Sequence, residues 1–140
     1  MIKVNNIFKS FKEEVLKNVT FDFAKGSIVG FLGPNGAGKS TLIKIMTGVI
    51  SPDKGSVYIN NVDITENRNI AKSNIGYIPE VPVGFNNLTV KEFLYFCGEI
   101  RDLKKEKINY ELALIDQQIQ IKNIFHKKME SLSKGMRQRI

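Results

Sequence analysis

A glycine-rich segment followed by lysine, serine and threonine restricts this chain more than any other feature. The segment reads Gly33-Pro34-Asn35-Gly36-Ala37-Gly38-Lys39-Ser40-Thr41 and fits the pattern G-x-x-x-x-G-K-[ST]. It follows the apolar run 28–32 and precedes the helix-like run 42–46. A backbone that surrounds an anion with its own N–H groups needs glycine where a Cβ would block the approach. The pattern therefore predicts a strand, a phosphate-binding loop and a helix in succession.

The residue types in this loop predict a site for a nucleoside triphosphate. Lys39 is expected to reach the β- and γ-phosphates, and the Ser40 hydroxyl is expected to become a ligand of Mg²⁺. The positive end of the helix dipole would face the phosphates. A chain of ordinary composition would show the fixed positions by chance in roughly one of a few hundred cases. An ordinary glycine-rich turn is therefore a poor explanation.

Composition and charge narrow the class of protein. The 140 residues suffice for one modest domain, and no apolar run is long enough to cross a bilayer. The single cysteine, Cys97, falls at an apolar position of a helical pattern, which predicts a small core residue of a cytoplasmic protein. The net charge of +7 comes from scattered lysines that do not alternate with aromatic residues. We therefore expect a solvated basic face and no nucleic-acid partner.

The first part of the chain has an α/β pattern. Apolar and polar residues alternate along residues 1–23, and the run 28–32 is expected to be a buried strand. A helix is predicted at about 39–48, ending at Gly48 before a turn cluster. Short strands are expected at 56–60 and 74–78, with a polar and partly helical link between them.

The second part of the chain has a helical pattern. Thr89-Val90-Lys91-Glu92 has the form of a capping box, and a last helix is predicted near Ser133. The residues expected on two apolar helix faces are Val90, Phe93, Leu94 and Cys97 on one, and Ile108, Leu112, Ile115 and Ile119 on the other. The change of pattern divides the chain into an α/β region, 1–84, and a helical region, 85–140.

Further motifs separate the families that share such a loop. Leu132-Ser133-Lys134-Gly135-Met136-Arg137-Gln138-Arg139-Ile140 closely resembles the signature motif of the ATP-binding cassette (ABC) family, in the form seen in its drug-export-like branch. Residues 75–80, IGYIPE, resemble the segment that ends in the family's Q-loop, and 88–94 resemble the start of its helical subdomain. No Asn-Lys-x-Asp element for reading guanine occurs. Several motifs in the family's order are more specific than one loop.

The resemblance implies roles for individual residues. Phe11 stands where the family has an aromatic residue that stacks on adenine, although Phe11 taken alone could equally pack in a core. Glu80 replaces the usual glutamine, and its carboxylate could bind Mg²⁺ directly or through water. The signature residues expected to bind the γ-phosphate held by a second subunit are Ser133, Lys134, Gly135 and Met136. His126 precedes the signature and is expected to be an ordinary surface histidine, not the family's switch histidine.

The resemblance also implies a fold and partners. We expect a P-loop NTPase (RecA-like) core with an antiparallel β subdomain and a helical subdomain. Such a protein is the ATP-binding subunit of an ABC transporter, for which the signature favours export. It would form a head-to-tail homodimer or heterodimer with ATP between the subunits and dock on a separate polytopic membrane subunit through residues 81–85. It would then lie at the inner face of the plasma membrane.

Two other functions stay open for this chain. A soluble ABC-type ATPase that acts on ribosomes or DNA is one alternative, and a non-catalytic remnant is the other. The family's Mg²⁺-binding aspartate, catalytic glutamate and switch histidine would all lie after Ile140. We therefore expect a C-terminally truncated domain that binds ATP without hydrolysing it and is poorly stable alone.

Overall fold

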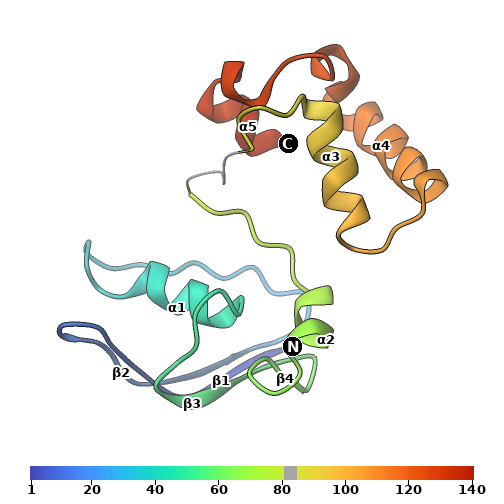
Figure 1. The fold of residues 1–140 in the computed structure, drawn as a ribbon. Helices are drawn as coiled ribbons and strands as arrows, with labels where there is room; N and C mark the ends of the chain where they lie inside the picture. Colours follow the sequence, from blue (N-terminus) through green and yellow to red (C-terminus); the bar gives the residue numbers. More distant parts are fainter. Residues whose placement is uncertain (81–84) are drawn as a thin grey trace. The chain divides into compact units, whose positions relative to one another are not determined.

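The computed structural model of this protein describes residues 1–80 and 85–140 (Figure 1). These residues form two compact units, residues 1–77 and residues 78–140. The predicted boundary between residues 84 and 85 falls at the segment 81–84, which lies outside the described residues. That boundary stays a prediction.

The first unit contains a four-stranded antiparallel sheet in the order β2-β1-β3-β4. Its strands are β1 (Ile2–Ser10), β2 (Glu14–Phe23), β3 (Lys54–Ile59) and β4 (Val62–Asp63). Val4 lies opposite Phe21 of β2 and Val57 of β3, so the central strand places its apolar residues between those of its neighbours. The alternation along residues 1–23 correctly predicted β1 and β2.

Two helices complete the first unit. Helix α1 (Lys39–Met46) buries Leu42, Ile45 and Met46 in the core that also contains residues of β1 and β3. The short helix α2 (Arg68–Ser73) contributes Ala71 to the same core. Helix α1 ends two residues before the predicted Gly48, since Thr47 is its C-cap. The core therefore holds the helix that follows the phosphate loop against the sheet.

The strands predicted at 28–32 and 74–78 are wrong. Residues 28–34 and 75–79 are neither strand nor helix, and Ile28 and Leu32 are almost fully exposed. Only Phe31 of the first run is partly buried, against Phe21 and Phe23. An apolar run becomes a strand only when its backbone pairs with another strand. Within the described ranges, neither segment has such a partner.

The second unit is helical. It contains α3 (Val90–Glu99), α4 (Lys105–Ile119), the 3₁₀ helices η1 (Ile121–Ile124) and η2 (Met129–Ser131), and α5 (Lys134–Arg139). The capping box is confirmed, because the Thr89 hydroxyl accepts from the Glu92 N–H and the Glu92 carboxylate accepts from the Thr89 N–H. A fully buried Val90 packs with Ile121, Met129 and Leu132 in the core of this unit.

The contact between α3 and α4 explains why one predicted apolar face is only half correct. A Cβ at Gly98 would lie 2.6 Å from the Ile108 side chain, so this glycine lets Ile108 pack directly on the backbone of α3. Ile108 and Leu112 are buried there, whereas Ile115 and Ile119 lie further along α4 and are exposed. Cys97 is half-buried, as a small packing residue would be, and burial raises the pKa of its thiol.

Candidate nucleotide-binding site

Two glycines shape the predicted phosphate loop for different reasons. Gly36 has φ +84° and Gly38 has φ +82°, both in the left-handed region that favours glycine. A Cβ at Gly36 would meet nothing within 4 Å, so only its backbone angle demands glycine. A Cβ at Gly38 would lie 2.7 Å from Leu16 Cδ2 and 3.0 Å from the Val15 carbonyl oxygen. Gly38 therefore also lets the loop pack closely on β2.

The loop closes around the ammonium group of Lys39. The Lys39 Nζ donates hydrogen bonds to the carbonyl oxygens of Gly33 at 2.7 Å and of Pro34 at 2.6 Å. The Ala37 N–H donates to the same Pro34 carbonyl at 3.3 Å, which completes a tight turn. A lysine ammonium has three donors. One Lys39 donor therefore remains for a ligand atom at the mouth of the loop.

Helix α1 begins with unused hydrogen-bond donors. Its N-cap, Gly38, has no side chain to accept a hydrogen bond, and its first turn contains no acidic residue. The Gly38 carbonyl accepts the first helical bond from the Leu42 N–H at 2.8 Å. In the parts of the chain that the structure describes, the N–H groups of Lys39, Ser40 and Thr41 have no acceptor.

These donors and the Lys39 ammonium form a site that fits a polyphosphate. Three backbone N–H groups, the helix dipole and one cation, all supplied by residues 33–41, favour negative charge at this end of α1. The Ser40 side chain is exposed at the second position of the helix. A hydroxyl oxygen beside bound phosphate is an oxygen ligand of the kind that Mg²⁺ binds.

The predicted adenine platform is an exposed ring. Phe11 lies in the turn between β1 and β2 and keeps 64% of its surface exposed, so it does not belong to the core. The ammonium of Lys9 lies 5.5 Å from the centroid of this ring. Lys9 and its ion-pair partner Asp53 are not among the residues predicted from the sequence. A lysine two residues before the aromatic was the only local signal for either of them.

The signature residues lie in the second unit, at the start of α5. The Ser133 Oγ caps this helix by accepting from the Met136 N–H at 3.2 Å. A Cβ at Gly135 would meet nothing within 4 Å, so this glycine faces open space. Arg137 fixes the segment by donating to the carbonyl oxygens of Leu132 and Glu130 at 3.1 and 3.0 Å. Lys134 is exposed.

Glu80 and His126 are exposed residues of the second unit. Ser40, the other predicted Mg²⁺ ligand, belongs to the first unit, so the pairing of Ser40 with Glu80 stays a prediction. Over residues 1–80 and 85–140, no three His, Cys, Asp or Glu side chains group as a metal site. No helix of that part of the chain is long and apolar enough to cross a membrane.

Known proteins share both the sequence pattern and the fold. The profile of the family described as ABC transporter matches residues 16–140. The molybdate/tungstate import ATP-binding protein WtpC of Pyrococcus abyssi is 34% identical over 140 residues, which are 100% of this chain and 40% of that protein. The chain thus spans about two-fifths of the length of this curated relative.

Two solved structures extend the likeness to three dimensions. An ATP-binding subunit of an ABC transporter superposes with a TM-score of 0.87 at 28% identity, covering 99% of this chain and 58% of that one. A dimeric ATP-binding cassette in a post-hydrolysis state with bound ADP and Pi superposes with a TM-score of 0.84 at 25% identity, covering 99% and 66%. These likenesses confirm the predicted P-loop NTPase fold.

Proposed function

This chain belongs to the ABC transporter family, and from that premise we propose that it binds Mg·ATP as part of the ATP-binding subunit of a transporter. The observation that carries the proposal is the construction of residues 33–41. These residues hold the Lys39 ammonium against the loop carbonyls and leave three N–H groups at the start of α1 without an acceptor. A triphosphate is the ligand whose charge and oxygen atoms suit that set of donors.

The residues around the loop have separate roles in this proposal. Lys39 binds the β- and γ-phosphates, and the exposed Ser40 hydroxyl binds Mg²⁺. Bound Mg²⁺ would neutralise phosphate charge, and Glu80 would contribute a carboxylate to its surroundings. Phe11 stacks on adenine. Ser133, Lys134, Gly135 and Met136 bind the phosphate held by a second cassette in a head-to-tail dimer.

The transporter as a whole is proposed on the strength of the relatives. Support for pairing between cassettes comes from one structural neighbour, which is a dimer. The export direction favoured by the signature has no support from the curated relative described above, which is named an import protein. We therefore propose transport driven by ATP and assign neither import nor export. The proposed location is the inner face of the plasma membrane.

Docking on a membrane subunit through residues 81–85 also stays a proposal. Residues 81–84 lie outside the described part of the chain. Phe85 is the one member of the patch that is described, and its ring centroid lies 5.6 Å from that of Phe93 and 4.9 Å from that of Phe96. A change at Phe85 would therefore disturb packing on α3 as well as any docking.

The test of nucleotide binding is an equilibrium titration of the 140-residue chain with Mg·ATP. Lys39→Ala should weaken binding by about 100-fold or more, because the phosphates lose a charge-assisted partner. Lys44→Ala is the matched control, since Lys44 lies on the same helix with an exposed side chain and should leave the affinity unchanged. Equal affinity for Lys39→Ala and the parent would refute the proposal.

The same preparation tests the proposal that these 140 residues bind ATP without turning it over. In the family that this chain resembles, hydrolysis depends on groups that have no counterpart among these 140 residues. Phosphate release should therefore stay at the level of the Lys39→Ala variant. Mg²⁺-dependent release that Lys39→Ala abolishes would show that the chain hydrolyses ATP by itself.

A further inference from the structure

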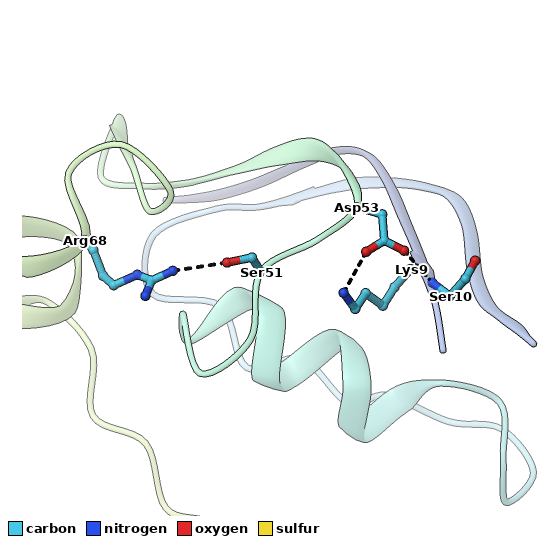
Figure 2. Close-up of polar contacts among 5 residues, drawn as sticks. All are labelled: Lys9, Ser10, Ser51, Asp53 and Arg68. Atoms are coloured by element: carbon cyan, nitrogen blue, oxygen red, sulfur yellow. Dashed lines mark hydrogen bonds and ion pairs between the residues drawn. The ribbon is translucent and has the colours of Figure 1, made fainter. Parts of the chain in front are cut away.

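Asp53 joins the segment after α1 to the end of β1 through three consecutive residues. Its N–H donates to the Phe8 carbonyl oxygen at 2.9 Å. Its carboxylate accepts from the Lys9 Nζ with Oδ1 and from the Ser10 N–H with Oδ2, each at 2.7 Å (Figure 2). Phe11 is the next residue along the chain. One residue thus fixes the part of β1 that leads into the turn carrying the exposed ring.

Lys9 connects this carboxylate to the ring itself. The Lys9 side chain is only 16% exposed, so its stem is held along the protein surface and not free in solvent. Its ammonium lies within the range of a cation–π contact with Phe11, at 5.5 Å from the centroid. The ring remains mostly exposed, which leaves room for a planar base to stack.

The charge state of Asp53 suits this arrangement. The hydrogen bond from Lys9, followed by that from the Ser10 N–H, holds the pKa of the Asp53 carboxyl below its ordinary value. The carboxylate is therefore ionised at any pH used for nucleotide binding. It can hold the Lys9 ammonium in place throughout that range.

We propose that Asp53 and Lys9 are positioning residues that hold Phe11 in the orientation that stacks on the nucleobase. This inference rests on the proposed function, because it needs a nucleotide in the loop. A ring held in its bound orientation loses less conformational freedom on binding, and the benefit appears as affinity for the base. The phosphates are bound by other residues, so Asp53 should not affect them.

The consequence is a link between the two ends of the nucleotide site. The loop that binds phosphate continues directly into α1, and residues 47–53 lead from the end of α1 to Asp53. Asp53 then holds the turn that carries Phe11. The phosphate donors and the ring are thereby connected by one continuous segment and one ion pair, in addition to the packing of Gly38 on β2.

The experiment compares the affinities of the 140-residue chain for Mg·ATP and for Mg·tripolyphosphate, which lacks the base. Phe11→Ala should lower the affinity for Mg·ATP by about tenfold or more, in keeping with the loss of one base–aromatic stack. Asp53→Ala and Lys9→Met should each lower the affinity for Mg·ATP by about three- to tenfold. None of these variants should change tripolyphosphate affinity by more than about twofold.

A double variant and a matched control separate positioning from general damage. In the Phe11→Ala background, Asp53→Ala should cause no further loss of ATP affinity, because there is no ring left to position. Arg68→Ala removes the 3.1 Å bond to the Ser51 hydroxyl in the same loop without touching β1 (Figure 2). It should leave both affinities unchanged.

Three outcomes would overturn the inference. Unchanged ATP affinity in Asp53→Ala would remove its role, and an equal loss for both ligands would show that it only maintains the fold. If Asp53→Ala does not fold, Lys9→Met decides by the same criteria. A parent chain that binds neither ligand would contradict the proposed function itself, and the inference with it.

Discussion

The phosphate loop and the signature segment are both predicted to bind phosphate, but they begin their helices in different ways. Gly38 starts α1 without a side-chain cap and leaves the first-turn N–H groups vacant. Ser133 starts α5 and uses its own hydroxyl to accept from the Met136 N–H. The loop also contains a lysine whose ammonium lies within it. The comparison teaches that the loop combines an uncapped helix start with an ammonium group, whereas the signature segment uses one of its own side chains as the helix cap.

The largest effect that would test this difference is expected at Gly38. Gly38→Ala would combine an unfavourable positive φ with close contacts to Leu16 and to the Val15 carbonyl oxygen. We expect it to lower the free energy of unfolding by about 2 kcal/mol or more. Denaturant unfolding should show the loss, and titration with Mg·ATP should show little binding.

Gly135→Ala is the matched substitution at the signature. This glycine is in α5 and has open space around its Cβ position, so alanine should be neutral or should stabilise the helix by at most about 1 kcal/mol. Similar losses of stability at both glycines would mean that the two segments do not differ in the way described.

A smaller effect is expected at Gly36, where only the backbone angle requires glycine. Gly36→Ala should lower the free energy of unfolding by about 1 kcal/mol, because a left-handed residue gains a Cβ but meets no neighbour. ATP affinity should fall less than in Gly38→Ala. The two variants can be compared by the same unfolding and titration measurements. A larger loss at Gly36 than at Gly38 would contradict the role of packing on β2.

At the signature, Ser133→Ala should remove the cap of α5 and nothing else. The expected loss is about 1 kcal/mol or less, because α5 is short and ends the described chain. ATP affinity of the 140-residue chain should stay within twofold of the parent, and Ser133→Asp should restore the cap. A clear fall in ATP affinity for Ser133→Ala would show that the signature joins the loop of its own chain.

The smallest expected effect is a loss of stability at the start of α3 when the pH is lowered. Hydrogen bonds from the Thr89 N–H and then the Thr89 hydroxyl hold the pKa of Glu92 below its ordinary value. A lowered pKa means that the carboxylate stabilises the start of α3 above its unfolded pKa and that this contribution is lost as pH falls through the folded value. Helix α1 has no acidic residue in its first turn and should show no comparable loss there.

Amide exchange at the start of α3 and of α1, measured from pH 6 to pH 3 and corrected for intrinsic rates, would check this. Glu92→Gln should make α3 insensitive to acid in that range. Because Glu92 is exposed, the change should be small. Equal acid sensitivity at the two helix starts would contradict the assignment to Glu92.

The sequence predicted those features whose signal is local. The glycines and Lys39 lie within nine residues of one another, and the capping box lies within four, so composition and spacing alone indicated both. The ion pair of Lys9 with Asp53 joins residues that are 44 positions apart, which no local pattern can reveal. The composition of the apolar run 28–32 favours burial and therefore predicts a strand. A strand also depends on a partner, and that information lies outside the run itself.

The first-turn N–H groups of α1 have no side-chain cap, so a bound nucleotide would supply the acceptors that Gly38 cannot. When phosphate occupies the loop, its oxygen atoms would accept from the N–H groups of Lys39, Ser40 and Thr41, so local opening of this turn must first release the ligand. At a free concentration of about 100 times Kd, that linkage adds about 2.7 kcal/mol to the opening free energy. Hydrogen exchange at these three amides should then slow by about 100-fold. The first turn of α1 would thus report occupancy of the site, whether or not any hydrolysis follows.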